Sequence, residues 1–373
     1  MDQVLSMLHG GLVNIGAFLA VLGVLVFVHE LGHYLAARSQ GVHAEVFSIG
    51  FGPAIFSWRD RSGTVWKLSW LPLGGYVRMH GMEMAEDATP EVRASWLPGR
   101  TYHEKPVWSR AIIIAAGPFA NFLLAAVLFA GLFMAMGKPV ATAVLGQVTP
   151  DGAAARAGLI VGDRVQSIGG EPVATFGDMQ RIVVANPGKT VQVGILRQDV
   201  AQTVAVEIGK RGPAGAETGF LGVGSGSVEY VPLGPGGAVV EGARQTWEVS
   251  VAIVQSVGQL LSGRRNADEM SGPIGIARMS GQVVQLGFAS LVGFIALLSV
   301  NLGVLNLFPI PVLDGGHLVF QAAEAVRGRP LPRRFQEYGF RAGLALLAAQ
   351  FIFVTWNDLA HTGLFRWISG LAG

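Results

Sequence analysis

The stretch that decides the fold runs from Gly11 to His33 and reads GLVNIGAFLAVLGVLVFVHELGH. Up to Val28 it contains no charged residue, and an apolar run of this length is typical of a helix that crosses a membrane. The run ends in His29-Glu30-Leu31-Gly32-His33. Residues four apart lie on one face of a helix, so His29 and His33 can hold one metal ion while Glu30 reaches an adjacent water molecule. The stretch therefore predicts a membrane-spanning helix that carries a metal site.

Three ionisable residues at the end of an apolar run need an explanation. A chance match to this short pattern does occur in soluble proteins without any metal. Here, however, each charged group at bilayer depth costs about 2.5–3.5 kcal/mol on insertion scales, and ionisable residues inside a membrane are functional as a rule. We therefore interpret His29 and His33 as metal ligands and Glu30 as the catalytic base of a metallopeptidase within the membrane.

The composition places the rest of the chain in the same class. Of 373 residues, 51% are hydrophobic and only 14% are charged, which predicts several membrane spans with one domain outside the bilayer. The net charge of +2, with no stripe of basic and aromatic residues, gives no reason to expect a nucleic-acid partner. The chain has no cysteine, so disulfides and thiolate ligands are excluded, and a site of histidines and carboxylates suits zinc.

Four apolar stretches are long enough to span a bilayer: residues 12–37, 111–136, 288–308 and 340–356. Lys and Arg residues are frequent in the segments 38–110 and 327–334, whereas the first 37 residues have none. Because basic residues favour the cytoplasmic side, both of these loops are predicted to be cytoplasmic. Both termini, and the long segment after the second span, are then predicted to lie outside the cytoplasm.

The segments between the spans divide the chain further. Residues 1–136 form a first membrane half, in which residues 44–79 alternate like strands and predict a β-hairpin or meander at the membrane interface. Residues 138–211 predict a small domain of strands and two helices. Residues 212–287 follow it and contain an amphipathic helix, about 236–263, that we expect near the outer membrane surface. Residues 288–373 form the second membrane half.

A catalytic zinc site usually takes three protein ligands and one water molecule, so a third residue must come from elsewhere in the chain. Asp314 is the best candidate. It lies in the stretch NLFPIPVLDGG (residues 306–316), where two prolines free the backbone at the end of the third span. Irregular backbone at membrane depth is tolerated only inside protein or beside a wet cavity. The alternative, a cytoplasmic turn that caps a helix, is weaker once the stretch is paired with His29 and His33.

These stretches resemble the site-two protease family of intramembrane zinc metalloproteases, and in particular its bacterial branch, the regulator of sigma-E proteases. The resemblance covers most of the chain, in the order 29–33, 49–53, 72–77, 116–121, 271–275 and 301–316. It implies one Zn²⁺ per chain, held by His29, His33 and Asp314, with Glu30 as base and acid in turn. It also implies that residues 138–211 are a PDZ domain. The expected fold is an α-helical polytopic membrane protein with four transmembrane helices and one PDZ-like α+β domain outside the membrane.

The same resemblance implies a zinc metalloendopeptidase that cuts within or beside the transmembrane segment of a single-span protein. The expected setting is the inner membrane of a bacterium, with the active site towards the cytoplasmic side and the lipid bilayer around it. The expected substrate is an anti-sigma factor already cut on its outer side, as in regulated intramembrane proteolysis, or a remnant signal peptide.

Four further residues are candidates for substrate binding. Asn301 and Asn306 map onto the family's asparagine-rich third helix, which implies substrate contact or oxyanion stabilisation; hydrogen bonding between helices explains them equally well. Gly50 and Gly52 would let an extended substrate pair closely with the segment 44–79. The alternative is that this segment only anchors the fold.

Two questions stay open at the level of sequence. The PDZ-like domain either binds a C-terminus left by an earlier cut or acts as a size filter. The whole chain also has two rival interpretations. One is a PDZ membrane scaffold without catalysis, which does not explain Glu30. The other is a membrane-anchored zinc protease that cuts soluble or misfolded proteins, with Glu324 or Glu337 as the third ligand.

Overall fold

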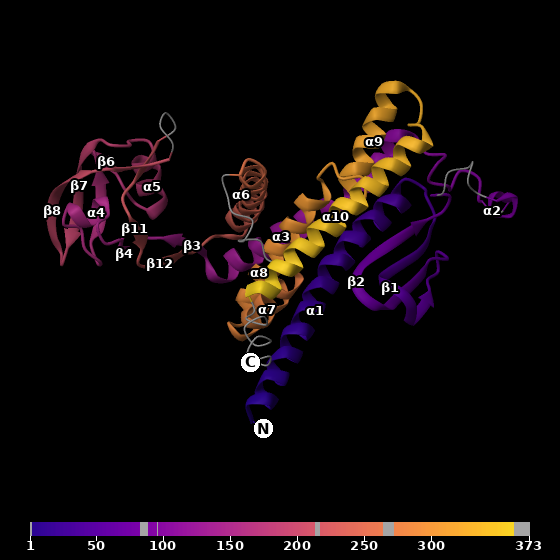
Figure 1. Cartoon of the computed structure of the whole chain (residues 1–373), viewed down its shortest axis with the longest axis horizontal. Helices are drawn as coiled ribbons and strands as arrows, with labels where there is room; N and C mark the ends of the chain where they lie inside the picture. The colour runs from indigo at the N-terminus through magenta and orange to yellow at the C-terminus, as the bar shows by residue number, and fades with distance from the viewer. Residues whose placement is uncertain (1, 83–88, 95, 213–216, 264–271, 362–373) are drawn as a thin grey trace, which may run out of the picture. The chain divides into compact units, whose positions relative to one another are not determined.

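The computed structural model describes residues 2–82, 89–94, 96–212, 217–263 and 272–361. Figure 1 labels the elements of the two compact units into which the chain divides. One unit consists of Met1–Leu132 and Val239–Gly373, and the other is the inserted segment Phe133–Ala238. The ends of the chain that were predicted to lie outside the cytoplasm, Met1 and residues 362–373, fall outside the described residues.

The larger unit is built mainly from helices. In the described part of the chain these are α1 (Asp2–Ser39), α2 (Pro90–Ala94), α3 (Val107–Met136), α6 (Pro235–Leu261), α7 (Pro273–Gln285), α8 (Phe288–Asn306), α9 (Asp314–Arg327) and α10 (Arg333–His361). Among the residues that the structure describes, four helical segments are long and apolar enough to cross a membrane, namely Gly10–Ser39, Val107–Met136, Phe288–Asn306 and Arg334–Ala360. The prediction of a multi-pass membrane protein with four spanning helices is therefore confirmed.

All four helices differ from the apolar pattern at one end or both. Helices α1 and α3 begin earlier than predicted, at Asp2 and Val107, and α1 ends at Ser39. Helix α8 ends at Asn306 instead of Phe308, because Phe308 precedes Pro309 and the residue before a proline avoids helical backbone. Helix α10 extends beyond the predicted span 340–356 at both ends, since its polar end residues continue the helix without adding to the apolar run.

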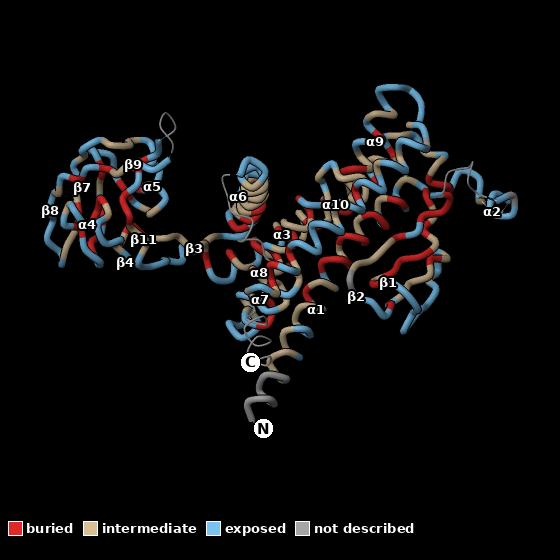
Figure 2. The backbone as a smooth tube through the Cα atoms, viewed as in Figure 1, coloured by how far each residue is buried: buried red, intermediate tan, exposed pale blue. Residues whose placement is uncertain are grey.

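Many residues of the spanning helices are exposed, as the pale blue segments of the tube in Figure 2 show, and many of these residues are apolar. On α3 these include Phe119, Leu123 and Val127. In water such side chains would be costly, but lipid tails are as apolar as leucine and surround them without penalty.

A long antiparallel hairpin of β1 (Ala44–Arg59) and β2 (Val65–Met79) follows α1. Its register shifts repeatedly through bulges, and its base is buried, whereas β1 is exposed from Gly52 to Arg59. Asp60 closes the turn by accepting hydrogen bonds from the backbone N–H of Ser62 (2.8 Å) and Thr64 (3.0 Å). The same carboxylate accepts one from the hydroxyl of Tyr34 (3.2 Å), which ties the hairpin to α1.

The inserted unit is a small α+β domain. Its strands are β3 (Lys138–Ala141), β4 (Leu145–Val148), β5 (Arg164–Ile168), β6 (Glu171–Pro172), β7 (Thr190–Arg197), β8 (Val200–Glu207), β9 (Gly209–Arg211), β10 (Thr218–Phe220), β11 (Val223–Ser225) and β12 (Val228–Val231), and its helices are α4 (Ala153–Arg156) and α5 (Phe176–Val184). Strands β6, β5, β7 and β8 form one antiparallel sheet in that order. A buried core that includes Val193, Ile195 and Val206 holds the helices against the strands.

This unit continues past Arg211, where the sequence analysis ended the domain. Strands β10, β11 and β12 pair with β9, β4 and β3, respectively. The last strand of the unit, β12, therefore pairs with its first strand, β3, with Val231 opposite Lys138. Strands of three or four residues with glycines between them carry too little periodicity to be recognised in the sequence. The helix predicted at about 236–263 is α6, and its place near the outer membrane surface remains a prediction.

Candidate metal centre

Three side chains from the two ends of the chain meet at one point. His29 and His33 lie one turn apart on α1, and Asp314 is the first residue of α9. The Nε2 atoms of the two histidines are 3.3 Å apart, and Oδ2 of Asp314 lies 3.2 Å from Nε2 of His29 and 3.5 Å from Nε2 of His33. Among the described residues this is the one group of three or more such side chains that could hold a metal ion.

The arrangement fits a zinc ion. Ligand atoms about 2.0–2.1 Å from a tetrahedral zinc are about 3.4 Å from one another, close to the three separations found here. Oδ2 of Asp314 is buried and, in the part of the chain that the structure describes, receives no hydrogen bond of good geometry. Two ring nitrogens and one buried carboxylate oxygen that converge within 3.5 Å of one another are well explained by a shared cation. Two imidazoles and one carboxylate are also a donor set that zinc accepts.

Residues of helix α3 contact His33 in this centre. His33 donates from Nδ1 to the backbone carbonyl of Ile113 (2.9 Å), which directs its Nε2 towards Asp314. A Cβ at Gly117 would overlap the imidazole of His33, and one at Gly32 would overlap the carbonyl of Ala116, so glycines on both helices permit the close approach. Pro118, the residue after Gly117, has no backbone N–H, so α3 lacks one helical hydrogen bond there.

The first turn of α9 carries Asp314 and is tightly held. A Cβ at Gly315 would overlap the carbonyls of Leu307 and Phe308, and one at Gly316 would overlap that of Ile310, so only glycine fits after the Asp. Further along the helix, Gln321 donates to the hydroxyl of Tyr102 (2.9 Å).

An ion pair with the first turn of α3 also holds α9. Glu324 pairs with Arg110 at 2.6 Å, with both side chains largely buried. Burial raises the pKa of Tyr102 to about 12, so its phenol stays protonated at neutral pH. Together these contacts fix the direction of α9 and with it the position of Asp314.

Glu30 lies next to His29 in the chain and is not part of the group that could hold a metal ion. Its side chain is buried, and the backbone of Val77 on β2 lies near its carboxylate. A Cβ at Gly75 would stand 3.0 Å from Cγ of Glu30, so β2 packs directly against this side chain. A carboxylate held next to a metal centre can accept and return a proton during hydrolysis.

The other predicted residues are less closely tied to the centre. Asn301 and Asn306 are half-buried on α8. Gly50 and Gly52 both adopt positive φ, and a Cβ at Gly50 would overlap the carbonyl of Leu71 across the hairpin. Glu324, an alternative third ligand in the sequence analysis, pairs with Arg110 instead, and neither it nor Glu337 belongs to the metal group in the described residues.

Two buried polar residues were overlooked as functional candidates. Asn121 is fully buried on α3 and lies 3.1 Å from Nδ1 of His29. Asp358 on α10 accepts hydrogen bonds from the backbone N–H of Gly272 and Gly275. Position 121 ends one of the stretches that carry the family resemblance, and Asp358 lies two residues beyond the predicted fourth span, so both had a signal in the sequence.

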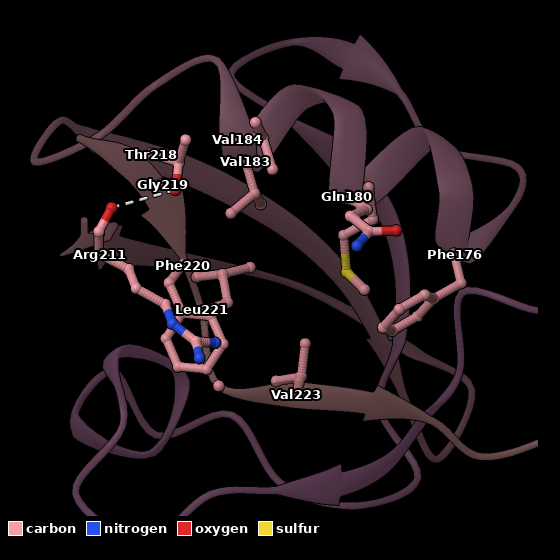
Figure 3. Close-up of a pocket in the computed structure, with 12 residues that line it drawn as sticks. Phe176, Gln180, Val183, Val184, Arg211, Thr218, Gly219, Phe220, Leu221 and Val223 are labelled. Carbon is pink, nitrogen blue, oxygen red and sulfur yellow. Dashed lines mark hydrogen bonds between the residues drawn. The ribbon is translucent and has the colours of Figure 1, made fainter. Parts of the chain in front are cut away.

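The inserted unit contains a second concave site. A groove of about 260 Å³ lies between α5 and the strands β10 and β11. Figure 3 shows that apolar side chains line it, including Phe176, Val183, Leu221 and Val223. At one end the guanidinium of Arg211 lies 5.5 Å from the centre of the Phe220 ring.

A metal centre with a free glutamate beside it, set on membrane-spanning helices, defines the chain as a metalloprotease of the membrane. Comparison with known families agrees. Residues 17–350 match the model of Peptidase family M50, and the chain belongs to that family.

Curated relatives resemble the chain over nearly its whole length. A Rhizobium meliloti protein named "Putative zinc metalloprotease R01501" is 45% identical and covers 93% of this chain and 96% of its own. Metalloprotease MmpA of Caulobacter vibrioides is 38% identical, with 97% and 99% covered. Zinc metalloprotease RasP of Geobacillus kaustophilus is 34% identical, with 93% and 97% covered.

Proposed function

We propose that this chain is an intramembrane zinc protease that hydrolyses peptide bonds in or near the transmembrane segment of single-span membrane proteins. The observation that carries the proposal is the place of Glu30 between His29 and His33, on a helix apolar enough to span a bilayer and beside Asp314. A scaffold without catalysis would have no use for a buried glutamate next to three converging ligands.

The reaction follows from the residues around the centre. Zinc held by His29, His33 and Asp314 would polarise the scissile carbonyl and make an attacking water molecule more acidic. Glu30 takes the proton of that water and passes it to the leaving amine. The close packing of β2 at Gly75 against Glu30 helps to hold this carboxylate in place for both transfers. Asn301 and Asn306 are proposed to contact the substrate or its oxyanion.

The hairpin is the proposed binding element for the substrate backbone. A transmembrane helix hides its peptide bonds, so the substrate must become extended before it is cut. An edge of the β1–β2 hairpin can pair with an extended segment, and Gly50 and Gly52 would allow close approach. Substrate spans that contain Gly or Pro should therefore be cut faster than a poly-leucine span, and equal rates for the two would count against this role.

The inserted unit is proposed to be a PDZ-like domain, with the groove between α5 and β10–β11 as its peptide site. It either binds an apolar C-terminus left by an earlier cut or excludes substrates with bulky outer domains. Because Lys138 pairs with Val231, residues 138–231 can be replaced by a short Gly-Ser linker with little strain. Loss of cleavage in this variant supports binding, whereas new cleavage of untrimmed substrates supports the filter.

The proposed setting is the inner membrane of a bacterium, with the termini and the PDZ-like domain periplasmic and the active site towards the cytoplasm. The proposed substrates are anti-sigma factors after a first outer cut, and remnant signal peptides. A protease for soluble or misfolded proteins is the second candidate, and it would cut an unfolded soluble protein as fast as a membrane-spanning one.

The deciding experiment uses purified wild-type protein and the Glu30→Gln variant in detergent, with a tagged single-span substrate trimmed on its outer side. Cleavage within the span that disappears with the substitution, or with a zinc chelator, is the expected result. If both proteins contain zinc and bind the substrate but neither cuts it, the scaffold interpretation replaces the protease.

A further inference from the structure

We propose that Asn121 is a positioning residue for the metal centre: in the metal-loaded protein its side-chain oxygen accepts the Nδ1 proton of His29 and so directs Nε2 of that histidine to the metal. The inference rests on the metal centre of the proposed function. It adds a role for Asn121 that concerns metal binding, and not contact with the substrate.

The environment of Asn121 supports this role. The residue has no exposed surface, and its side-chain nitrogen lies 3.1 Å from Nδ1 of His29. Its side-chain oxygen is buried and has no hydrogen-bond partner among the described residues. Within the part of the chain that the structure describes, the imidazole of His29 is therefore the one hydrogen-bond partner of this buried amide.

Metal binding decides which amide atom faces the imidazole. A histidine that binds a metal through Nε2 carries its proton on Nδ1, and a buried N–H needs an acceptor. The nitrogen of Asn121 cannot accept, but a half-turn of the amide exchanges its oxygen and nitrogen without moving any other atom. The exchange gives His29 its acceptor and leaves the amide oxygen paired.

The other histidine, His33, also has an acceptor for its Nδ1 proton on α3. His33 donates from Nδ1 to the carbonyl of Ile113, also on α3, while its Nε2 faces Asp314. Helix α3 thus offers one acceptor to each imidazole, a backbone carbonyl for His33 and a side-chain oxygen for His29. Asn121 is itself held from α8, since Ser299 donates to its backbone carbonyl at 2.8 Å and both residues are fully buried.

The test compares metal affinity in the full-length protein in detergent. Zinc binding is measured by competition with a chromophoric chelator, and the geometry of the site by the visible absorption of the cobalt-substituted protein. The variants are Asn121→Leu, which has a similar size and no acceptor, and Asn121→Asp, which keeps an acceptor. Asn357→Leu on α10 controls for the loss of a buried asparagine elsewhere in the membrane unit.

We expect Asn121→Leu to weaken zinc binding about 10–100-fold and to alter the cobalt spectrum, the range typical of residues that orient metal ligands. Asn121→Asp should stay within a few-fold of wild type with an unchanged spectrum, and so should Asn357→Leu. Wild-type affinity and spectrum in Asn121→Leu, together with slower cleavage, would show that Asn121 acts on the substrate and would overturn the proposal.

The remaining outcomes are also decisive. Loss of zinc in Asn121→Asp equal to that in Asn121→Leu would overturn the proposal as well, because the acceptor is retained there. If Asn121→Leu does not fold, Asn121→Asp alone decides in the same way. A wild-type protein that binds no zinc would instead contradict the proposed function, so the two failures are distinguishable.

Discussion

The backbone of Gly117 on α3 lies against the imidazole ring of His33 on α1, so closely that a Cβ at position 117 would overlap three atoms of the ring. The ring cannot move aside without losing either its hydrogen bond to Ile113 or its approach to Asp314. The absence of a side chain at Gly117 therefore permits the position that His33 takes in the proposed metal centre, although the residue has no chemistry of its own.

The first prediction is that Gly117→Ala loses zinc. The added methyl group would push His33 away from the other ligands, and a misplaced ligand lowers metal affinity by about 10–100-fold. Zinc content after dialysis against a weak chelator measures the effect. Gly131→Ala, on the same helix, is the matched control, because a Cβ at Gly131 meets no atom within 4 Å. Equal zinc content in the two variants would show that the helices can separate to admit the side chain.

Much of this centre could be predicted from the sequence, because its chemistry lies in short motifs. His29 and His33 are one helical turn apart, so their common face follows from helix geometry alone. The prediction of Asp314 as the third ligand depended on a further rule, that prolines and glycines near membrane depth mark irregular backbone. The long apolar runs likewise predicted the four spans, with errors at their ends, where polar residues continue α10 and Pro309 stops α8 early.

The remaining features depend on contacts between distant parts of the chain. Gly75 and Glu30 are 45 positions apart, and Asn121 is separated from His29 by 92, so no periodicity connects them. The end of the inserted unit was missed for a similar reason, since β12 is recognisable as a strand only through its pairing with β3.

The second prediction concerns the hairpin and the base. In Gly75→Ala the new Cβ would meet Cγ of Glu30 as well as the side chain of Val26, so the carboxylate of Glu30 should shift. A displacement of about 1 Å at a catalytic group can cost roughly 100-fold in rate. We expect kcat to fall by that order while zinc content stays unchanged. Gly23→Ala, on α1 with open space around it, should keep the wild-type kcat.

The third prediction separates the two proposed third ligands. Asp314→Asn should abolish stable zinc binding, whereas Glu324→Gln should keep one zinc per chain. Glu324→Gln breaks the largely buried pair with Arg110 and should lower the unfolding free energy by about 2 kcal/mol, between the values of exposed and buried pairs. Zinc stoichiometry and thermal unfolding in detergent measure both effects. Zinc loss in Glu324→Gln alone would assign the ligand to Glu324.

The fourth prediction is a pH dependence of the inserted unit. Hydrogen bonds from the guanidinium of Arg197 (2.7 Å) lower the pKa of Asp163, and they outweigh burial, which acts in the opposite direction. A pKa below that of the unfolded chain, about 3.9, stabilises the fold above that pH, and the stabilisation is lost as the pH falls towards the folded-state pKa.

Asp163→Asn should therefore destabilise the unit at neutral pH, by roughly 2–3 kcal/mol for a charge-assisted hydrogen bond, and flatten its response to acid below pH ~4. Hydrogen exchange of the amides in β5 and β7, corrected for intrinsic rates, measures both changes in the full-length protein. The exposed substitution Glu207→Gln should leave the acid response unaltered. An acid response in Asp163→Asn as steep as in wild type would mean that another carboxylate is responsible.

The fifth prediction assigns Asp358 to the attachment of α7. The first turn of a helix has N–H groups without helical partners, and the buried carboxylate of Asp358 accepts two of them, from Gly272 and Gly275, at 2.9 Å each. In Asp358→Asn the amide can accept at one atom only, so one N–H loses its partner at a cost of about 1–3 kcal/mol. Amide exchange at Gly275 should accelerate while zinc content is unchanged.

Thr355→Val is the neighbouring control. Its buried hydroxyl has no hydrogen-bond partner among the described residues, so its loss should leave amide exchange in α7 unchanged. Unaltered exchange in Asp358→Asn would mean that packing against α1 alone holds α7.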